Sequence, residues 1–354
     1  MQIKELGEFG LISRLTAGLT AANTETHLGV GDDCAVLHYG EERDILVTTD
    51  LLLEGVHFDL QYTPLQHLGY KSAMVNLSDI YAMGGRPRQL TVSIGISSRF
   101  SVEDMELFYS GLSRACQAHG CDIVGGDTTS SRTGLTISIT AIGDVAAGQA
   151  ITRRGARPND IICVSGDLGA AYMGLQLLER EKAVYNQQLQ EAIDRGQKPD
   201  ELPPFEPDFA GREYILERQL KPEARADIVK ALADAGLRPT AMMDISDGLS
   251  SELHHICSQS NTGCRIYEDR LPLDYQTAAM AEELNLNVTT CALNGGEDYE
   301  LLFTLPLTDH DRAAALPGIK VIGHMTPPGQ GLLLIGRDGA ELDLKAQGWN
   351  PLAT

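Results

Sequence analysis

The sequence is short of positive charge. Of its 354 residues, 28 are Lys or Arg and 49 are Asp or Glu, so the formal net charge at pH 7 is −21. Nucleic-acid binders neutralise backbone phosphates with clustered basic side chains, and this balance therefore argues against that class of protein. The same surplus of acid disfavours docking on anionic membranes. The carboxylates either keep the surface hydrated or gather into cation sites, and composition leaves both options open.

Long apolar runs and paired cysteines are also missing. No apolar run approaches the ~20 residues of a membrane span. The N-terminal segment MQIKELGEFGLISRL lacks the basic start and the continuous apolar core of a signal peptide. We therefore expect a soluble, cytoplasmic protein. The seven scattered cysteines contain no C-x-x-C pair, which excludes a zinc ribbon and a thioredoxin motif and favours reduced, buried thiols.

Several nucleotide- and metal-binding motifs are absent as well. The sequence has no G-x-x-x-x-G-K-[ST] loop, no H-E-x-x-H and no G-x-S-x-G. Cys34 stands where a dinucleotide fingerprint beginning at Gly29 needs its third glycine. An EF-hand counted from Asp244 fails, because its twelfth position is His255 instead of Glu. The nine histidines form no recognisable ligand pattern.

Length and patterning predict two domains of mixed α/β structure. At ~100–200 residues per domain, a chain of this length makes two, and we place the boundary at residue 148, giving 1–148 and 149–354. The expected fold class is α/β of the α+β type, with strands and helices mixed without a strict repeat. The proline-containing stretch Tyr185–Phe209 is interpreted as a surface insertion. We expect strands at 43–50, 89–97, 122–124, 135–145, 161–165, 241–245 and 299–305. We expect helices at 64–83, 101–120, 170–181, 223–235 and 247–258.

What the sequence does have is a set of short acidic motifs at expected strand ends and turns. Each places a carboxylate beside a glycine or a hydroxyl, where backbone can approach a ligand closely. They are Gly31–Asp33, Thr48–Asp50, Asn76–Asp79, Gly125–Asp127, Asp244–Gly248 and Gly295–Asp298. One Asp at a turn is usually a local cap, but this many favour sites for hard cations such as Mg²⁺, which take oxygen ligands. Carboxylate-bound Mg²⁺ facing substrate phosphates suits phosphoryl transfer, where positioning and charge neutralisation are the main tasks.

In this order, the motifs resemble the thiamine-monophosphate kinase family. The resemblance covers nearly the whole chain and rests on Gly31–Val36, Thr48–Asp50, Glu54–Phe58, Gly69–Lys71, Val75–Asp79, Ala82–Pro87, Gly125–Asp127, Ser165–Gly169, Met243–Leu249 and Gly295–Leu301. It implies a two-domain fold like that of aminoimidazole ribonucleotide synthetase, with N-terminal sheets that pair in a homodimer. It also implies Mg²⁺-assisted transfer of the γ-phosphoryl group of ATP to thiamine monophosphate, which yields thiamine diphosphate.

The resemblance implies roles for individual residues. The implied Mg²⁺ ligands are Asp32, Thr48, Thr49, Asp50, Asp79, Asp127, Asp244 and Asp247. Of these, Asp50, Asp127 and Asp247 act in catalysis through the metal, without a covalent nucleophile. The implied ATP contacts are Tyr109, Gly126, Asp127, Arg153 and Ser246. The implied thiamine-phosphate contacts are His57, Glu297 and Trp349. Arg154 is the alternative to Arg153, and Lys71 and Arg86 are further candidates for a phosphate contact.

Two other interpretations stay open on the sequence. One is another ATP-dependent enzyme of the same superfamily. A selenophosphate synthetase would need a reactive cysteine near its N-terminus, whereas the first cysteine here, Cys34, lies inside an acidic motif. A hydrogenase-maturation enzyme would end in a tail that contains cysteine, whereas this sequence ends in Pro351–Thr354. Glu54–Phe58 also differs from what an aminoimidazole ribonucleotide synthetase would carry. The other is a non-catalytic Mg–nucleotide-binding protein on the same fold. The intact set of acids speaks against it, because a binder needs few metal ligands.

Overall fold

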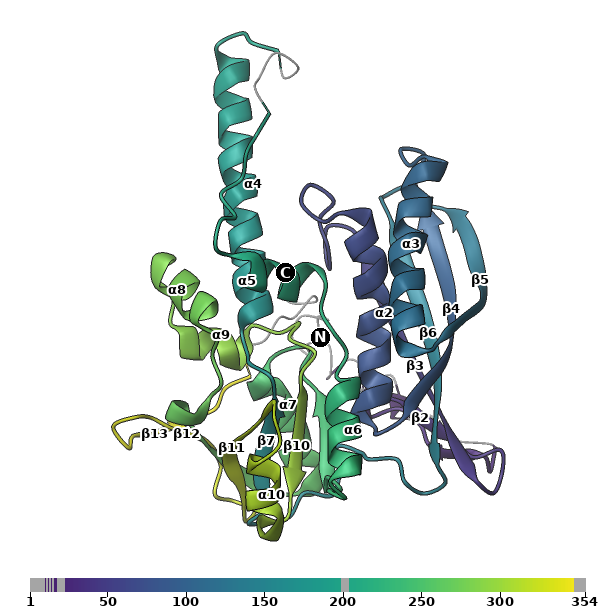
Figure 1. Cartoon of the computed structure of the whole chain (residues 1–354), viewed down its shortest axis with the longest axis vertical. Helices are drawn as coiled ribbons and strands as arrows, with labels where there is room; N and C mark the ends of the chain where they lie inside the picture. The colour runs from purple at the N-terminus through teal and green to yellow at the C-terminus, as the bar shows by residue number, and fades with distance from the viewer. Residues whose placement is uncertain are drawn as a thin grey trace.

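Two mixed β-sheets, one from each half of the chain, form the framework of the molecule (Figure 1). The structure is a computed structural model that describes residues 23–198 and 204–346, together with 10, 12, 14, 16 and 17. The first sheet, in the order β1-β2-β3-β6-β4-β5, consists of β1 (Thr26–Leu28), β2 (Ala35–Leu37), β3 (Arg43–Leu53), β4 (Arg86–Ile96), β5 (Asp122–Ser130) and β6 (Thr136–Ala146). The second, in the order β13-β12-β9-β11-β7-β10-β8, consists of β7 (Ile161–Ser165), β8 (Ala241–Asp244), β9 (Gly263–Tyr267), β10 (Leu301–Leu305), β11 (Ile319–Thr326), β12 (Leu332–Ile335) and β13 (Glu341–Asp343).

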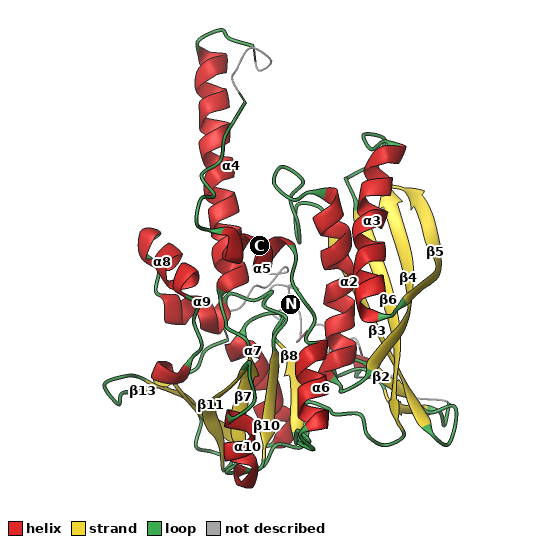
Figure 2. Ribbon diagram, in the orientation of Figure 1, coloured by secondary structure: helices red, strands yellow, loops and turns green. Residues whose placement is uncertain are grey.

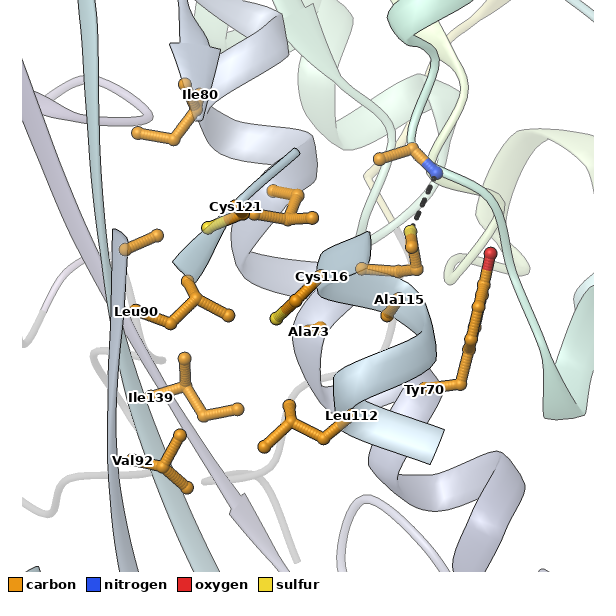
Figure 3. Packing of buried hydrophobic residues seen from close by; sticks show 14 of the residues in the cluster. Tyr70, Ala73, Ile80, Leu90, Val92, Leu112, Ala115, Cys116, Cys121 and Ile139 are labelled. Atoms are coloured by element: carbon orange, nitrogen blue, oxygen red, sulfur yellow. Dashed lines mark hydrogen bonds between the residues drawn. The ribbon is translucent and has the colours of Figure 1, made fainter. Parts of the chain in front are cut away.

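Helices cover only one face of the first sheet, which we call its inner face. Along β6 buried and partly buried residues alternate, as expected for a strand with one covered side. Leu90, Val92 and Ile139 point from the sheet toward Leu112 of α3 (Val102–His119) and toward α2 (Leu65–Ala82) (Figure 3). No described helix packs on the opposite, outer face, and the edge strand β5 is exposed along most of its length (Figure 2).

Both faces of the second sheet are covered. Every residue of β7, β8 and β10 is buried, which explains their continuous apolar sequences. One face packs on α7 (Leu249–Ser260), and the other packs on α6 (Ala226–Asp234) and α10 (His310–Ala314). Val229 of α6 also packs against the core of the first sheet, so this helix joins the two halves. The remaining helices are α4 (Ala170–Asp194), α5 (Glu213–Leu220), α8 (Tyr275–Glu283), α9 (Val288–Asn294) and the 3₁₀ turns 268–270 and 307–309.

The expected elements are confirmed in most places. The capping box of α3 is present, since Ser101 Oγ accepts from the Asp104 N–H (3.2 Å) and Asp104 accepts from the Ser101 N–H (2.8 Å). β5 is longer than expected and runs to Ser130. Pro64 is the N-cap of α2, not its first residue. The first sheet ends at Ala146 and the second begins at Ile161, on either side of residue 148, but the division into two domains there stays a prediction.

The helix expected at 170–181 is too short, and the surface insertion is partly helical. The helix α4 continues to Asp194, into the stretch interpreted as a surface insertion, and extends away from the rest of the molecule (Figure 1). Its second half buries little apolar area, so it lacks the periodic signal of a packed helix. Strong helix formers and local side-chain bonds such as Gln187–Glu191 (3.1 Å) support it instead. The helix α5 was not predicted, and the helix predicted at 223–235 begins three residues before α6 does.

Two glycines fix the distance between α2 and α3. A Cβ atom on Gly69 would lie 1.9 Å from the Phe108 carbonyl oxygen, and one on Gly111 would lie 1.8 Å from the Gln66 carbonyl oxygen. The backbones can therefore approach this closely only because neither position carries a side chain. This contact determines where α2 lies on the sheet, and α2 supplies two charged residues to the site described below.

None of the described helices is long and apolar enough to cross a membrane.

Replacing Gly111 by Ala is expected to destabilise the protein. Ala in place of Gly usually stabilises a helix by about 1 kcal/mol, but here the added methyl meets backbone, and overpacking costs about 1–3 kcal/mol. The neighbouring change Ser110→Ala, on the exposed side of α3, should alter stability by less than about 0.5 kcal/mol. The free energy of unfolding from urea titration measures both. A Gly111→Ala variant as stable as wild type would contradict the close helix contact.

Candidate active site between the two sheets

A cavity of about 970 Å³ lies where the two halves of the chain meet. Residues from β3, α2 and the segment 55–63 line it on one side, and residues from α4, α5, the end of β8 and the loop before β10 line it on the other. Carboxylates dominate the lining, which includes Asp32, Asp33, Asp50, Asp59, Asp79, Glu179, Asp244, Asp247 and Glu297. Three cationic side chains line it too, from Lys71, Arg153 and Lys182.

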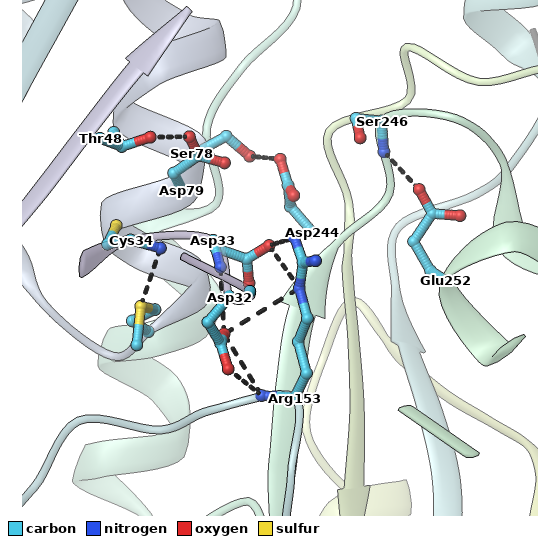
Figure 4. Close-up of polar contacts among 12 residues, drawn as sticks. Asp32, Asp33, Cys34, Thr48, Ser78, Asp79, Arg153, Asp244, Ser246 and Glu252 are labelled. Atoms are coloured by element: carbon cyan, nitrogen blue, oxygen red, sulfur yellow. Dashed lines mark hydrogen bonds and ion pairs between the residues drawn. The ribbon is translucent and has the colours of Figure 1, made fainter. Parts of the chain in front are cut away.

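Three of these carboxylates converge on one point. Asp33 comes from the loop before β2, Asp79 from α2 and Asp244 from the last position of β8, and one oxygen of each lies within 4.8 Å of the others. Asp79 accepts a hydrogen bond from Thr48 Oγ1 and Asp244 accepts one from Ser78 Oγ, both at 2.6 Å (Figure 4). Two full charges 4.8 Å apart repel by about 3 kcal/mol at an effective dielectric constant of about 20. The cluster therefore needs compensation.

Burial and mutual repulsion raise the pKa values of this group. Burial, followed by the Asp33 charge, raises the pKa of Asp244 to about 7. Burial, followed by Asp50 and Asp244, raises that of Asp79 well above its ordinary value. Asp32 and Asp50 are both raised to about 6, mainly by burial. The charged forms are thus disfavoured in the protein alone, as in a site that is completed by a cation.

The donor set fits a hard divalent cation. Buried Asp33 Oδ2 and Asp50 Oδ2 have no hydrogen-bond partner among the described residues, so both offer open lone pairs. Carboxylate oxygens are the ligands that Mg²⁺ takes in proteins. Among the described residues, Arg153 supplies the positive charge closest to this cluster, through an ion pair with Asp33 and a backbone N–H bond to Asp32 (3.0 Å). One guanidinium cannot offset this number of carboxylates.

A buried glutamate shapes the loop that carries Ser246 and Asp247. Glu252, 1% exposed in α7, accepts hydrogen bonds from the backbone N–H groups of Ser246 (3.2 Å) and Asp247 (2.8 Å). Figure 4 shows Glu252 pointing toward Ser246. Gly248 follows at φ 118°, and a Cβ there would lie 2.9 Å from Asn294. The loop is therefore held from two sides. Glu252 acts on the site by holding the loop backbone and not by binding a ligand itself.

Another part of the cavity has a different charge pattern. There Lys71 Nζ of α2 forms an ion pair with Glu297 Oε1 (2.9 Å), and Gln219 Nε2 of α5 donates to Glu297 Oε2 (2.9 Å). Glu297 has the left-handed backbone angle φ 57°, which costs a non-glycine residue about 1 kcal/mol or more. A 2.6 Å bond from its N–H to the Ser246 carbonyl helps to hold it there. His57 Nδ1 accepts from the Leu53 N–H (3.0 Å), which fixes that ring beside the pair.

Comparisons with known proteins identify the family of this chain. A family model described as AIR synthase related protein, N-terminal domain, matches residues 31–145. The thiamine-monophosphate kinase of Bacillus subtilis is 30% identical over 351 residues, 98% of this chain and 99% of that protein. The thiamine-monophosphate kinase of Aquifex aeolicus is 36% identical over 337 residues, 93% of this chain and 98% of that protein. This chain belongs to the thiamine-monophosphate kinase family.

The fold supports this membership. The structure of AaThiL complexed with AMPPCP and TMP superimposes with a TM-score of 0.79 at 34% identity, and the match covers 99% of this chain and 98% of that one. The molecule therefore has the two-sheet α/β fold of the AIR synthase related proteins. The near full-length identity to thiamine-monophosphate kinases also separates this chain from the other superfamily members considered above.

The cavity brings together most residues that the thiamine-monophosphate kinase resemblance implies. Those that line it are Asp32, Thr48, Thr49, Asp50, His57, Asp79, Arg153, Asp244, Ser246, Asp247 and Glu297. Arg153 lines it and Arg154 does not, and Arg86 is exposed at the start of β4 outside it. The Thr49 hydroxyl donates to the Ile139 carbonyl (3.0 Å) and lies on the outer face, opposite to the side chains of Thr48 and Asp50.

Three of the described residues that the resemblance implies do not line the cavity, and a fourth lies outside the described residues. Gly126 and Asp127 lie on the exposed edge strand β5. Tyr109 packs from α3 against the core of the first sheet. Trp349 lies outside the described residues. The roles that the resemblance implies for these four residues therefore stay predictions.

Other site residues had escaped the sequence reasoning. Asp33, not Asp32, is the member of its pair that meets Asp79 and Asp244. The Asp32–Asp33 motif had signalled an acid there without showing which oxygen points inward. Glu252 and Gln219 had no signal, because each is an ordinary polar residue within a helix until tertiary contacts bury it.

Removing one clustered charge is expected to stabilise the cation-free protein. At pH 8, above the pKa of about 7 for Asp244, Asp244→Asn relieves like-charge repulsion with Asp33 and should raise the melting temperature in EDTA by a few degrees. It should also reduce the further rise that Mg²⁺ produces in wild type. The matched change Glu103→Gln, in the exposed first turn of α3, should leave the Mg²⁺ response unchanged. A less stable Asp244→Asn protein in EDTA would contradict the repulsive cluster.

The role of Glu252 can be separated from its charge. Glu252→Gln keeps a carbonyl oxygen for the Ser246 and Asp247 N–H groups, whereas Glu252→Ala leaves both without an acceptor. We expect the Mg²⁺ concentration that gives half of the thermal shift to rise about tenfold or more for Ala and less than about threefold for Gln. Equal Mg²⁺ midpoints for Ala and wild type would show that Glu252 does not position this loop.

Proposed function

We propose that this protein phosphorylates thiamine monophosphate to thiamine diphosphate, with ATP as the donor. The observation that carries the proposal is one cavity in which all the implied metal ligands except Asp127 meet the implied substrate contacts His57 and Glu297. Near full-length identity to thiamine-monophosphate kinases supports the same reaction. The solved complex of AaThiL with AMPPCP and TMP supports a site for two phosphate-bearing ligands.

The part of the cavity around Asp33, Asp50, Asp79 and Asp244, which we call the carboxylate end, would receive the nucleotide phosphates. Asp33, Asp50, Asp79 and Asp244 would hold Mg²⁺, which when bound supplies the positive charge that phosphates and carboxylates share. Arg153, whose side chain contacts Asp33, adds a further charge beside them. Positioning donor and acceptor in line is then the main task left to the chain.

Direct transfer is favoured over a covalent intermediate. Cys34 directly follows Asp33 in the sequence, and it is 1% exposed. Burial, followed by the Asp79 charge, raises its pKa well above the ordinary value, which disfavours a thiolate. No thiol or imidazole other than His57 and Cys291 lines the cavity among the described residues. The pKa of His57 is lowered by burial, which keeps the ring neutral near pH 7.

The protein works as a homodimer that pairs the outer faces of the first sheet. In the register, Asp50 pairs with Ile139, Ile139 with Val92, and Val92 with Gly126. Three strand spacings put Asp127 about 14 Å from the Asp50 strand, whereas two ligands of one Mg²⁺ lie within about 4 Å. Asp127 also lies on an exposed strand. We therefore place Asp127 of each protomer at the site of its partner.

The reaction is tested by incubating the protein with ATP, Mg²⁺ and thiamine monophosphate and measuring thiamine diphosphate. We expect stoichiometric ADP and thiamine diphosphate. ATP binding without product would favour a non-catalytic Mg–nucleotide-binding protein, and product from another phosphate acceptor alone would favour another enzyme of the superfamily.

Subunit mixing tests the shared site. Asp50→Asn and Asp127→Asn should each abolish turnover alone. Co-expressed with different tags and isolated as heterodimers, they should recover about half of the wild-type activity, because one of the two sites then has both carboxylates. The control pair Asp50→Asn with Asp247→Asn should recover none, since both residues line the cavity of one protomer. A verified Asp50→Asn/Asp127→Asn heterodimer without activity would place Asp127 in its own protomer's site or outside the site.

A further inference from the structure

Lys71 is the most buried of the three cations that line the cavity. Its side chain is 4% exposed, compared with 16% for Arg153 and 24% for Lys182. It projects from the middle of α2, whose position is fixed by the glycine contact with α3. A buried ammonium is costly unless its surroundings use the charge. The placement of Lys71 therefore needs an explanation.

The other two cations are already committed elsewhere. Arg153 is bound by Asp32 and Asp33 at the carboxylate end. Lys182 forms ion pairs with Asp59 (2.9 Å) and Glu179 (3.0 Å). Lys71 is the cation next to Glu297, the implied thiamine-phosphate contact.

The hydrogen-bonding capacity of Lys71 is not used up. An ammonium has three N–H donors. Glu297 Oε1 lies 2.9 Å from Nζ, and the Gln219 carbonyl accepts at 3.2 Å. Within the described residues no third acceptor contacts Nζ, although the group lines the cavity. One donor of a buried point charge is thus available to a ligand.

We propose that Lys71 binds the phosphate of the acceptor substrate, with Glu297 and Gln219 holding the ammonium in place. The proposal rests on the proposed kinase function and names the group that recognises the acceptor's phosphate. Ammonium groups bind phosphates strongly as point charges. The remaining oxygens of that phosphate face the carboxylate end, from which the transferred group arrives. Lys71 thus distinguishes phosphorylated from unphosphorylated thiamine.

The test compares two ligands that differ only in the phosphate. Isothermal titration calorimetry measures the affinities of thiamine monophosphate and of thiamine for wild type, Lys71→Met and Lys71→Arg. We expect wild type to prefer thiamine monophosphate by about tenfold to hundredfold, and Lys71→Met to lose that preference to within about threefold. Lys71→Arg should keep part of it, because the charge remains. In Lys71→Met the KM for thiamine monophosphate should also rise, while the KM for ATP changes little.

A purely structural role gives a different result. If Lys71 serves only to hold Glu297, Lys71→Met weakens both ligands equally and the preference for the phosphate is unchanged, which would overturn the proposal. Wild-type protein that binds thiamine but shows no preference for the phosphate would also overturn it. Wild-type protein that binds neither ligand overturns the proposed function itself, and the proposal with it.

Two further variants guard against misfolding and general charge effects. Lys71→Met combined with Glu297→Gln leaves neither partner of this ion pair charged, and it too should lose the preference for the phosphate. A double variant that keeps the wild-type preference would contradict the proposal. Lys182→Met removes another cation of the cavity and should retain the preference, because Lys182 is paired with Asp59 and Glu179. Loss of the preference in Lys182→Met as well would point to general electrostatics and against a specific contact.

Discussion

Repulsion between buried carboxylates is the constraint on which the rest of this structure depends. Asp33, Asp79 and Asp244 come from three separate elements and meet in a space that excludes much of the solvent. Such a cluster persists only because each element is held independently. The glycine contact of α2 with α3 holds Asp79, and the fully buried strand β8 holds Asp244. The stability of the two cores thus offsets the electrostatic cost of the site, as is common at functional sites.

The charged side chains of the cavity form distinct groups. One group places carboxylates around a single arginine, and another places Lys71 against Glu297. This arrangement suits the proposed reaction between two anions: a carboxylate end that binds cations would receive one phosphate chain, and a fixed ammonium would receive the other. It also explains how a protein with a net charge of −21 accommodates polyanions. The acidity matters where the carboxylates converge, while most of it lies on the surface.

Several features were predictable because they depend on neighbours in sequence. The Ser101–Asp104 capping box and the strand at 43–50 follow from local hydrogen bonding and β-branched composition, and both are present. The second half of α4 was missed because helix propensity without an apolar stripe gives no periodic signal. Five of the six acidic motifs contribute residues to one cavity, whereas Gly125–Asp127 lies on the exposed strand β5. Alternation along β3 also turns the Thr49 hydroxyl away from Thr48 and Asp50.

The sequence by itself determined the acidic motifs, their order and hence the family, because those are properties of residue type and spacing. Only the tertiary structure decided that Asp33 meets Asp79 and Asp244, that Glu252 holds the Ser246 loop, and that Lys71 is buried beside Glu297. Each of these contacts joins residues that are brought together by the packing of α2, α5, α7 and the two sheets. Long-range packing, and not local propensity, places charges within reach of one another, so their roles emerge only once the chain is folded.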